Sequence, residues 1–293
     1  VVGYVATDEV TQKTRSNLVD EAHLENFIYK NYVSEIVVSQ IKNKSNSVEL
    51  YAELLRYLER GLVIRQYKEV YENSTYRLPI NFESKELYKF FPFSRSNQNK
   101  LYVYFSRIFD IGFSVLGLLG FFSIAPILWL VNLIANRGSF FYSQERVGKN
   151  GIPFTIYKLR TMVQDAEKNG AVFATVGDAR ITPFGKFLRK TRLDELPQFI
   201  NVLKGEMAII GPRPERPVFV TEISAIIPLY QTRHVIKPGL TGWAQVNYSY
   251  GSNLEDSLMK LRYDLYYIKH RSLFLDINIV LKTMSTILFF RGQ

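Results

Sequence analysis

Residues 111–136 read IGFSVLGLLGFFSIAPILWLVNLIAN and contain no charged side chain. Asp110 and Arg137 bound this run. A straight helix of that length would be about 39 Å long at 1.5 Å per residue, which exceeds the roughly 30 Å of a bilayer's hydrocarbon core. The run therefore predicts a helix that inserts into a membrane.

Pro126 and the flanking charges bear on how such a helix would insert. A proline removes a helical N–H and kinks the helix. Basic residues flank both ends of the run, so the positive-inside rule gives no orientation. A re-entrant helix over about 108–136, which breaks near Ala125-Pro126 and returns to the same face, fits both facts. A spanning helix with a proline kink and a buried helix of a soluble protein are the alternatives.

The first part of the chain alternates strand and helix patterns. Strand-like and helical segments fall, in chain order, at residues 1–6, 18–32, 35–40, 48–60 and 62–67. This βαβαβ order predicts a partial Rossmann-like parallel sheet over residues 1–75. No G-x-G-x-x-G follows the first strand, so we favour a structural or regulatory module over a nucleotide-binding one.

A polar, irregular segment predicts a linker over residues 76–104, with a second domain over residues 105–293. Position 1 is Val and lies within an apolar pattern, so we expect the chain to be part of a longer protein. The predicted fold is an α/β module followed by a mostly α, membrane-associated domain with a membrane helix and amphipathic interfacial helices.

The composition narrows the chemistry. The 293 residues carry a formal net charge of +10, which implies an anionic partner such as nucleic acid, an acidic membrane or a phosphorylated substrate. The chain has no cysteine and only three histidines, which lack metal-ligand spacing. Disulfides and thiolate sites are excluded, and a Ser-His-Asp triad is disfavoured. Carboxylates and basic side chains must therefore carry the chemistry.

Basic, amphipathic patterns follow the apolar run. Thr182-Pro183 predicts the start of a short helix, FGKFLRK, whose Phe and Leu side chains can lie against lipid while its cations face headgroups. Longer helices are predicted at about 217–234, 254–269 and 273–290.

Two adjacent carboxylates, Asp194 and Glu195, stand where a helix should begin. Asp194 reads as the N-cap, Pro197 is tolerated in the first turn, and Gly205 ends the helix. The positive end of a helix keeps a carboxylate ionised and attracts phosphate. Taken alone, the pattern is most often a simple cap.

Nearby cations favour a functional role for this pair over a simple helix cap. Arg213 lies between two prolines that restrict its backbone, and its planar fork suits phosphate oxygens. Arg189 precedes the pair, and Lys158 and Arg160 lie at a predicted strand end. Two carboxylates with convergent cations suit phosphoryl transfer, in which a carboxylate is a nucleophile or metal ligand.

Four segments together resemble one protein family. They are QERVGKNGIPFTIYKLRTM, LRKTRLDELPQFINVLKGEMAIIGPRPERP, KPGLTGWAQVN and LRYDLYYIKHRSLFLDINIVLKT. In this order and spacing they resemble the bacterial sugar transferase family, the monotopic polyprenyl-phosphate phosphoglycosyl transferases. The resemblance covers about Phe105 to the C-terminus. The βαβαβ module is similar to the middle domain of large-type members, whose N-terminal transmembrane bundle this chain would lack.

The resemblance implies a reaction and roles for particular residues. Asp194 matches the nucleophile that attacks a UDP-sugar, releases UMP and forms a phosphosugar ester, and Glu195 matches its partner. Undecaprenyl phosphate would then take the phosphosugar. Mg²⁺ is the implied cofactor, with both carboxylates as its ligands. Arg213 resembles the family's phosphate-binding arginine.

The remaining implied residues are supporting ones. Arg189, Lys158, Arg160 and Glu215 join the predicted substrate-binding set, while Asp264 and Asp276 fall on acidic family positions that can also brace helices. Pro126 stands for the helix break, although the family carries Ser-Pro there and this chain has Ala-Pro. Ser123 is the candidate substitute for the missing hydroxyl.

The resemblance also implies partners and location. It places the enzyme at the bacterial inner membrane with its catalytic domain on the cytoplasmic face, among membrane lipids and without nucleic acid. The larger relatives suggest a homodimer, and the GPRPERP form favours a UDP-hexose such as glucose or galactose. Two alternatives stay open: a metal-dependent glycosyltransferase that releases UDP, and a non-catalytic scaffold that binds membrane or nucleic acid.

Overall fold

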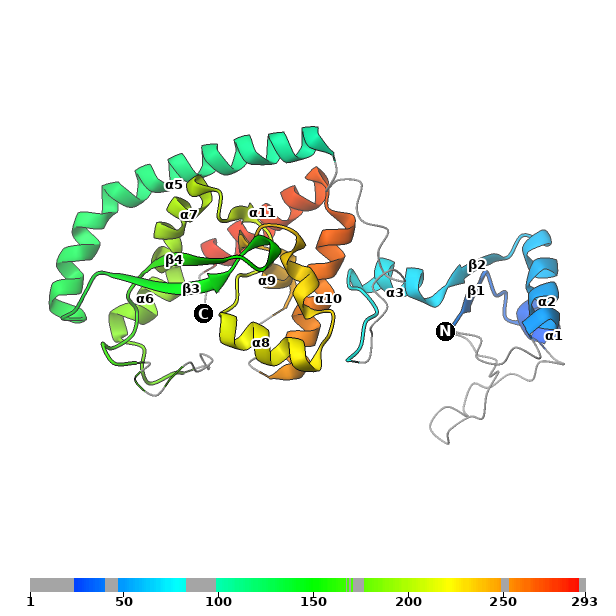
Figure 1. The fold of residues 1–293 in the computed structure, drawn as a ribbon. Coiled ribbons are helices and arrows are strands. Elements are labelled where there is room, and N and C mark those ends of the chain that lie inside the picture. Colours follow the sequence, from blue (N-terminus) through cyan, green and yellow to red (C-terminus); the bar gives the residue numbers. More distant parts are fainter. Residues whose placement is uncertain are drawn as a thin grey trace. The chain divides into compact units, whose positions relative to one another are not determined.

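The structure is a computed structural model that describes residues 24–39, 47–82, 99–166, 168, 170, 177–248 and 253–289. The chain divides into two compact units, residues 1–79 and residues 80–293. Each unit is described by itself below, with the element labels of Figure 1.

The first unit contains a small parallel sheet. Its elements are α1 (Leu24–Lys30), β1 (Glu35–Val38), α2 (Ser47–Glu59), β2 (Val63–Gln66) and α3 (Tyr67–Thr75). β1 and β2 pair in parallel, with Glu35 opposite Val63, which confirms the parallel pairing predicted for these two strands. The strand predicted at residues 1–6 lies outside the described residues. Helix α3 was not predicted, because its sequence YKEVYENST is mostly polar and its first residue was assigned to the preceding strand.

A single long helix, α5 (Lys100–Ala135), opens the second unit. The side chain of Asn99 caps it by accepting hydrogen bonds from the backbone N–H groups of Leu101 and Tyr102, at 3.0 and 3.3 Å. This cap explains why the helix begins at Lys100 rather than near residue 108. The last residues of the predicted linker, 100–104, are therefore helical.

Pro126 lies inside α5, and the helix continues through it without an interruption. Figure 1 shows α5 running along one edge of the unit and bending toward its C-terminal end. The hydroxyl of Ser123 donates to the carbonyl oxygen of Gly120 at 2.7 Å. It does not reach the carbonyl of Phe122, from which a proline at position 126 withholds its usual helical donor. Re-entry to one membrane face stays a prediction.

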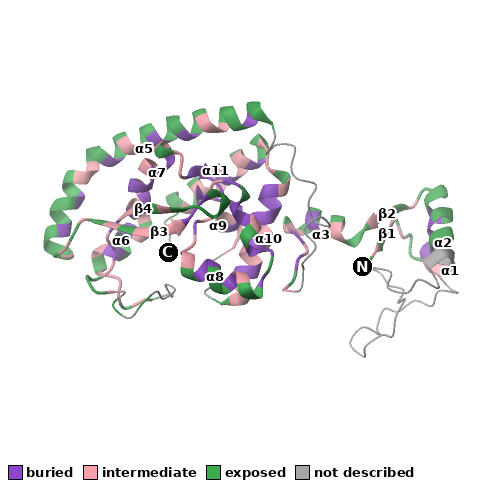
Figure 2. Cartoon of the chain, in the orientation of Figure 1, coloured by how far each residue is buried: buried purple, intermediate pink, exposed green. Residues whose placement is uncertain are grey.

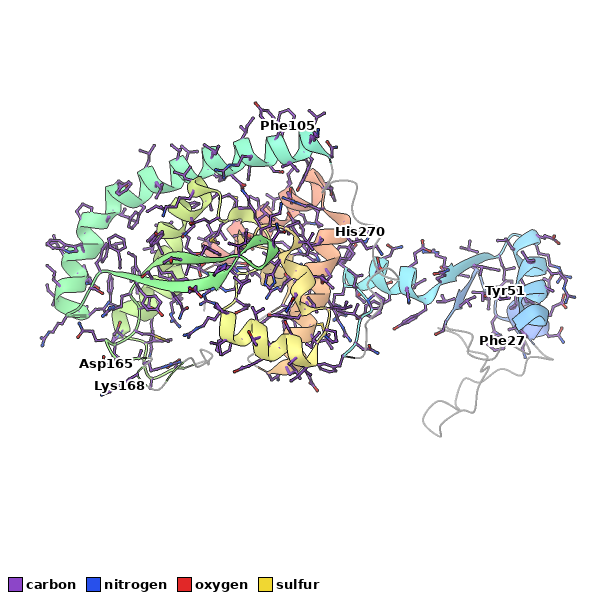
Figure 3. All side chains as sticks on the ribbon, viewed as in Figure 1. Phe27, Tyr51, Phe105, Asp165, Lys168 and His270 are labelled. Carbon is purple, nitrogen blue, oxygen red and sulfur yellow. The ribbon has the colours of Figure 1, made fainter. Side chains whose placement is uncertain are left out.

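The outer side of α5 is apolar and exposed. Among the described residues, α5 is the helix long and apolar enough to cross a membrane, and only 17% of its most apolar 18-residue window is buried. The core helix of a soluble protein would be mostly buried, so this exposure favours a lipid-facing helix. Figure 2 shows the exposed positions along α5, and Figure 3 marks Phe105 near its start.

A two-stranded antiparallel ribbon follows α5. Its strands β3 (Phe141–Val147) and β4 (Pro153–Leu159) are joined through the short turn η4 (Lys149–Gly151), and Tyr142 lies opposite Lys158. The ribbon packs under the C-terminal half of α5, where Phe121, Leu128, Leu159 and Leu188 form one buried cluster.

Helix α6 (Pro183–Thr191) begins where the sequence predicted. The Thr182 hydroxyl oxygen accepts from the N–H of Gly185 at 2.9 Å, which confirms the predicted cap. The prediction that both Phe and Leu face lipid is wrong for one of them, because Leu188 is buried in the cluster beneath α5. Phe187 is exposed and stacks on Phe184.

The next segments are short. They are η5 (Leu193–Gln198), α7 (Phe199–Lys204), β5 (Ala208–Ile210), α8 (Pro217–Ile226), η6 (Tyr230–Val235) and β6 (Gly239–Thr241). The single helix predicted over 217–234 is wrong, because Pro228 divides it into α8 and η6. Ile227 adopts the extended conformation expected before a proline. β5 and β6 pair in parallel, with Ala208 opposite Gly239.

Three helices complete the second unit: α9 (Trp243–Asn247), α10 (Leu254–His270) and α11 (Leu273–Leu288). The last two confirm the predicted pair. Asn253 and Asp256 form a capping box at the start of α10, and the Ser272 side chain caps α11. α10 packs on α9 and η6. In the described residues, the fold is mostly helical with small two-stranded sheets and one long apolar helix.

Candidate active site

Asp194 and Glu195 lie in the 3₁₀ segment η5, between α6 and α7. The N-cap prediction for Asp194 is wrong, because α7 begins only at Phe199 and the turn is made earlier, at Arg192, whose φ is 60°. That left-handed residue ends α6 and starts η5 at once. Tertiary packing of Leu193 and Leu196 beneath α5 accompanies this path. The two carboxylates still occupy the first turn of a helical segment.

Glu195 is buried among three cations. Its Oε1 accepts from Lys158 Nζ at 3.0 Å and from Arg213 Nη2 at 2.9 Å, while Arg192 Nη1 lies 3.8 Å from Oε2. Burial alone would raise the pKa of Glu195, but Lys158, Arg213 and Arg192 hold it well below its usual range. Glu195 is therefore an ionised carboxylate that forms ion pairs with three cationic side chains.

Asp194 has a different environment from its neighbour. Its side chain is buried, and its Oδ1 has no hydrogen-bond partner in the described structure. Burial, and next the charge of Glu195, raise the pKa of Asp194 to about 6, against the lowering effect of Lys158 and Arg189. An unpartnered carboxylate oxygen of this kind is costly to stability and is available for chemistry.

The turn that carries Arg213 is held by close backbone packing. A Cβ on Gly239 would lie 2.0 Å from the Gly211 nitrogen, so only glycine permits this approach. The Gly211 N–H donates to the Thr241 carbonyl oxygen and the Gly239 N–H to that of Pro212, both at 2.9 Å. The turn therefore presents Arg213 to Glu195 from a fixed backbone.

A buried ion pair supports the same turn. Arg233 donates from Nη2 to Asp264 Oδ2 at 2.7 Å and to the Arg213 carbonyl oxygen at 2.9 Å. Asp264, predicted as a supporting residue, thus reaches the site through Arg233. Sequence reasoning missed Arg233, because one cation in YQTRHVI carries no local signal that it is buried.

Of the other predicted cations, Arg189 lies near the carboxylates and Arg160 does not. Arg189 donates from Nε to the Thr161 hydroxyl at 3.0 Å and is near enough to lower the pKa of Asp194. Arg160 instead lies beside Gly138, beyond the end of α5, where its Nη1 is buried without a hydrogen-bond partner among the described residues. The structure thus brings Lys158, Arg189 and Arg213 to the carboxylates and leaves Arg160 apart.

The remaining predicted residues have structural contacts. Glu215 lies 3.7 Å from Arg146 across an ion pair, and its backbone oxygen accepts from Val147. Asp276 accepts hydrogen bonds from the hydroxyls of Tyr102 and Tyr267, so it braces the start of α5 against the α10–α11 junction. Pro126 is exposed on α5.

The two carboxylates are candidate ligands for a metal ion. Within the described part of the chain, no group of three or more His, Cys, Asp or Glu side chains forms a metal cluster. Magnesium needs no such cluster, because it binds through one or two carboxylates together with substrate phosphates and water. Among the described residues, Asp194 Oδ1 has no hydrogen-bond partner, and Glu195 Oε2 lies 3.8 Å from Arg192 Nη1. Two adjacent carboxylates of this kind fit a magnesium ion.

Several known proteins are similar to this chain. A UDP-N-acetylgalactosamine-undecaprenyl-phosphate N-acetylgalactosaminephosphotransferase of Aeromonas hydrophila is 38% identical over 255 residues, 87% of this chain and 59% of that protein. A UDP-glucose:undecaprenyl-phosphate glucose-1-phosphate transferase of Xanthomonas campestris is 42% identical over 60% of this chain and 37% of its own length. A galactosyl transferase of Streptococcus agalactiae is 32% identical over 97% of this chain and 61% of its own length.

The chain spans less than two thirds of the length of each of these three relatives. A family profile described as bacterial sugar transferase matches residues 101–290. The match includes α5 from its second residue onward, both carboxylates, the Arg213 turn and the buried pair that supports it. The chain belongs to the bacterial sugar transferase family.

Proposed function

We propose that the chain transfers a sugar 1-phosphate from a UDP-sugar to undecaprenyl phosphate through an ester on Asp194, and that it releases UMP. One observation carries the proposal: a buried, unpartnered carboxylate oxygen on Asp194 lies beside a carboxylate that gathers Lys158, Arg213 and Arg192. The names of the Aeromonas and Xanthomonas relatives support the same substrate classes.

The chemistry proceeds in two displacements at one phosphorus. A carboxylate oxygen of Asp194 attacks the β-phosphorus of the UDP-sugar, the bond from that phosphorus to the UMP oxygen breaks, and UMP leaves. A phosphate oxygen of undecaprenyl phosphate then attacks the same phosphorus. The bond to Asp194 breaks, the carboxylate is restored, and the product is a lipid-linked diphosphate sugar. No proton must move to or from Asp194.

The cations bind and orient the diphosphate. Lys158 and Arg213 are partly exposed, and Arg presents a fork that suits phosphate oxygens. Glu195 forms ion pairs with both cations and so holds them next to Asp194. We also propose that Mg²⁺ binds at Asp194 and Glu195, where it would reduce the repulsion between carboxylate and diphosphate.

The membrane helix suits a lipid-borne acceptor. A water-soluble UDP-sugar and a lipid phosphate must reach the same carboxylate, so the site belongs at headgroup depth. The exposed apolar side of α5 is consistent with membrane association. We propose a re-entrant α5 at the bacterial inner membrane, with the catalytic domain on the cytoplasmic face.

The sugar is a hexose or an N-acetylhexosamine in this proposal. Glucose and galactose were favoured by the GPRPERP turn, and the relatives' names add N-acetylgalactosamine. A panel of these UDP-sugars, each with undecaprenyl phosphate in detergent, identifies the donor.

The released nucleotide tests the reaction class. Transfer of a sugar phosphate releases UMP, whereas a glycosyltransferase that moves the sugar alone releases UDP. Chromatography of the nucleotide products should show UMP in proportion to the lipid product. UDP as the product would overturn the proposal in favour of the glycosyltransferase alternative.

A further inference from the structure

The long helix α5 contacts two segments that build the active site. One is the carboxylate arm, defined as Leu193–Lys204, which comprises η5 and α7. The other is the phosphate arm, defined as Ala208–Pro214, which comprises β5 and the turn with Arg213. Arg107, Asp110 and Gly117 on α5 make the contacts.

Arg107 holds the C-terminal end of the carboxylate arm. Its Nη1 donates to the carbonyl oxygen of Val202 at 2.6 Å, and its Nη2 donates to that of Leu203 at 2.7 Å. The last carbonyls of a helix lack partners in their own helix and carry a partial negative charge. A guanidinium at this position therefore pins the end of α7 to α5.

Gly117 receives the other end of the same arm. A Cβ on Gly117 would lie 2.3 Å from Cε2 of Phe199, so the Phe199 ring occupies the space that a side chain would need. Phe199 is the first residue of α7, directly after η5. Contacts at both ends thus fix α7, and with it the segment that carries Asp194 and Glu195.

Asp110 holds the phosphate arm. Its Oδ1 accepts from the backbone N–H of Ile209 at 2.8 Å, and the side chain is buried. Ile209 is the middle residue of β5, and the flanking residues Ala208 and Ile210 pair with β6. β5 therefore lies between α5 and β6, immediately before the turn that presents Arg213.

We propose that Arg107, Asp110 and Gly117 are positioning residues, through which α5 sets the placement of Asp194 relative to Arg213. The inference rests on the proposed function, because it assigns these residues to the same reaction. None of the three touches the carboxylate pair, so their effect passes through α7 and β5. The membrane helix is then part of the active-site framework as well as an anchor.

Because the two arms carry different groups, we expect a shift of each arm to affect a different kinetic constant. The carboxylate arm carries the nucleophile, so a shift of α7 lowers kcat. The phosphate arm carries Arg213, so a shift of β5 weakens UDP-sugar binding and raises KM. A misplacement of about 1 Å can cost on the order of 100-fold in rate.

Two glycines on α5 offer a matched pair of variants. Gly117→Ala places a methyl group against Phe199, whereas Gly120→Ala meets nothing within 4 Å. Alanine favours helix over glycine equally at both positions. We expect Gly117→Ala to lower kcat by about 10-fold or more, and Gly120→Ala to match the wild type.

Two substitutions of Asp110 test the second contact. Asp110→Asn keeps an oxygen that can accept from Ile209, whereas Asp110→Leu removes it. We expect Asp110→Leu to raise KM by about 10-fold and Asp110→Asn to stay within about twofold of wild type. Hydrogen exchange of peptides within residues 193–214 adds a readout independent of activity, with faster exchange in Gly117→Ala and Asp110→Leu.

The outcomes separate the two proposals. A wild-type protein that releases no UMP contradicts the proposed function. In that case, hydrogen exchange of residues 193–214 still tests whether α5 positions the two arms. An active wild type whose Gly117→Ala and Gly120→Ala variants have equal kcat and equal exchange overturns the inference. Equal loss in Asp110→Asn and Asp110→Leu also overturns it. Should Asp110→Leu fail to fold, the glycine pair decides.

Discussion

Arg233 and Asp264 form an ion pair in which Nη2 and Oδ2 lie 2.7 Å apart and the side chains are only 4% and 1% exposed. The same Arg233 nitrogen donates to the carbonyl oxygen of Arg213. A buried pair joining η6 and α10 therefore supports the turn that presents a phosphate-binding arginine to Glu195.

Asp264→Ala should destabilise the second unit strongly. It leaves the Arg233 guanidinium buried without its counter-charge, which costs about 3–5 kcal/mol in comparable pairs. Thermal or denaturant unfolding in detergent measures the loss. Glu222→Gln, at an exposed position on α8, is the control and should change stability by less than about 0.5 kcal/mol. Equal stability of the two variants would show that the pair contributes nothing.

Asp194→Asn should stabilise the protein while it removes activity. The pKa of Asp194 is raised from 3.8 to about 6 in the folded protein, so the native state binds this proton more tightly than the unfolded chain. The charge therefore costs stability above pH 6, and that cost disappears as the pH falls through 6 toward 3.8.

Unfolding at two pH values checks this sign. The variant should exceed the wild type by on the order of 1–3 kcal/mol at about pH 7.5, and the difference should shrink at about pH 5. A variant less stable than the wild type at the higher pH would mean that Asp194 makes a stabilising contact instead.

The rate of the covalent step should fall at acidic pH. Asp194 must be ionised to attack, so kcat/KM for UDP-sugar should decline about tenfold per pH unit below its pKa of about 6. Glu195→Gln removes the neighbouring negative charge, which lowers the pKa of Asp194 and moves the acidic limb to lower pH. A limb that stays in place, or moves upward, is inconsistent with a repulsive neighbour.

Removal of divalent metal should stop turnover. Two adjacent carboxylates can hold Mg²⁺ with a diphosphate, and without it the carboxylate and diphosphate repel each other. Treatment with a chelator should abolish UMP release, and added Mg²⁺ should restore it. Full activity in the chelator would mean that Lys158, Arg189 and Arg213 alone neutralise the negative charges of the carboxylate and the diphosphate.

Local sequence signals predicted the elements that depend on local chemistry. Thr182-Pro183 marked the start of α6, and Lys158, predicted at a strand end, lies at the end of β4. The convergence of Lys158 and Arg213 on Glu195 agrees with the predicted grouping of carboxylates and cations. Pro228 is an equally local signal, because a proline ends α8 and separates it from η6.

Long-range contacts were not predictable in the same way. Asp110 marked only the boundary of the apolar run, since nothing near it in sequence indicates Ile209 as its partner. Arg233 has no signal that separates a buried cation from a solvated one. The N-cap prediction for Asp194 failed because the chain turns earlier, at Arg192. Arg192 has a positive φ, which an arginine rarely adopts, so nothing in the sequence indicates this turn.

Intact mass measurement of the protein tests the central claim most directly. Incubation with Mg²⁺ and a UDP-sugar, without lipid acceptor, should add the mass of one sugar phosphate to the wild type. Undecaprenyl phosphate should then remove it, and Asp194→Asn should show no adduct. An adduct of equal yield in Asp194→Asn, or lipid product formed by that variant at the wild-type rate, would contradict a covalent role for Asp194.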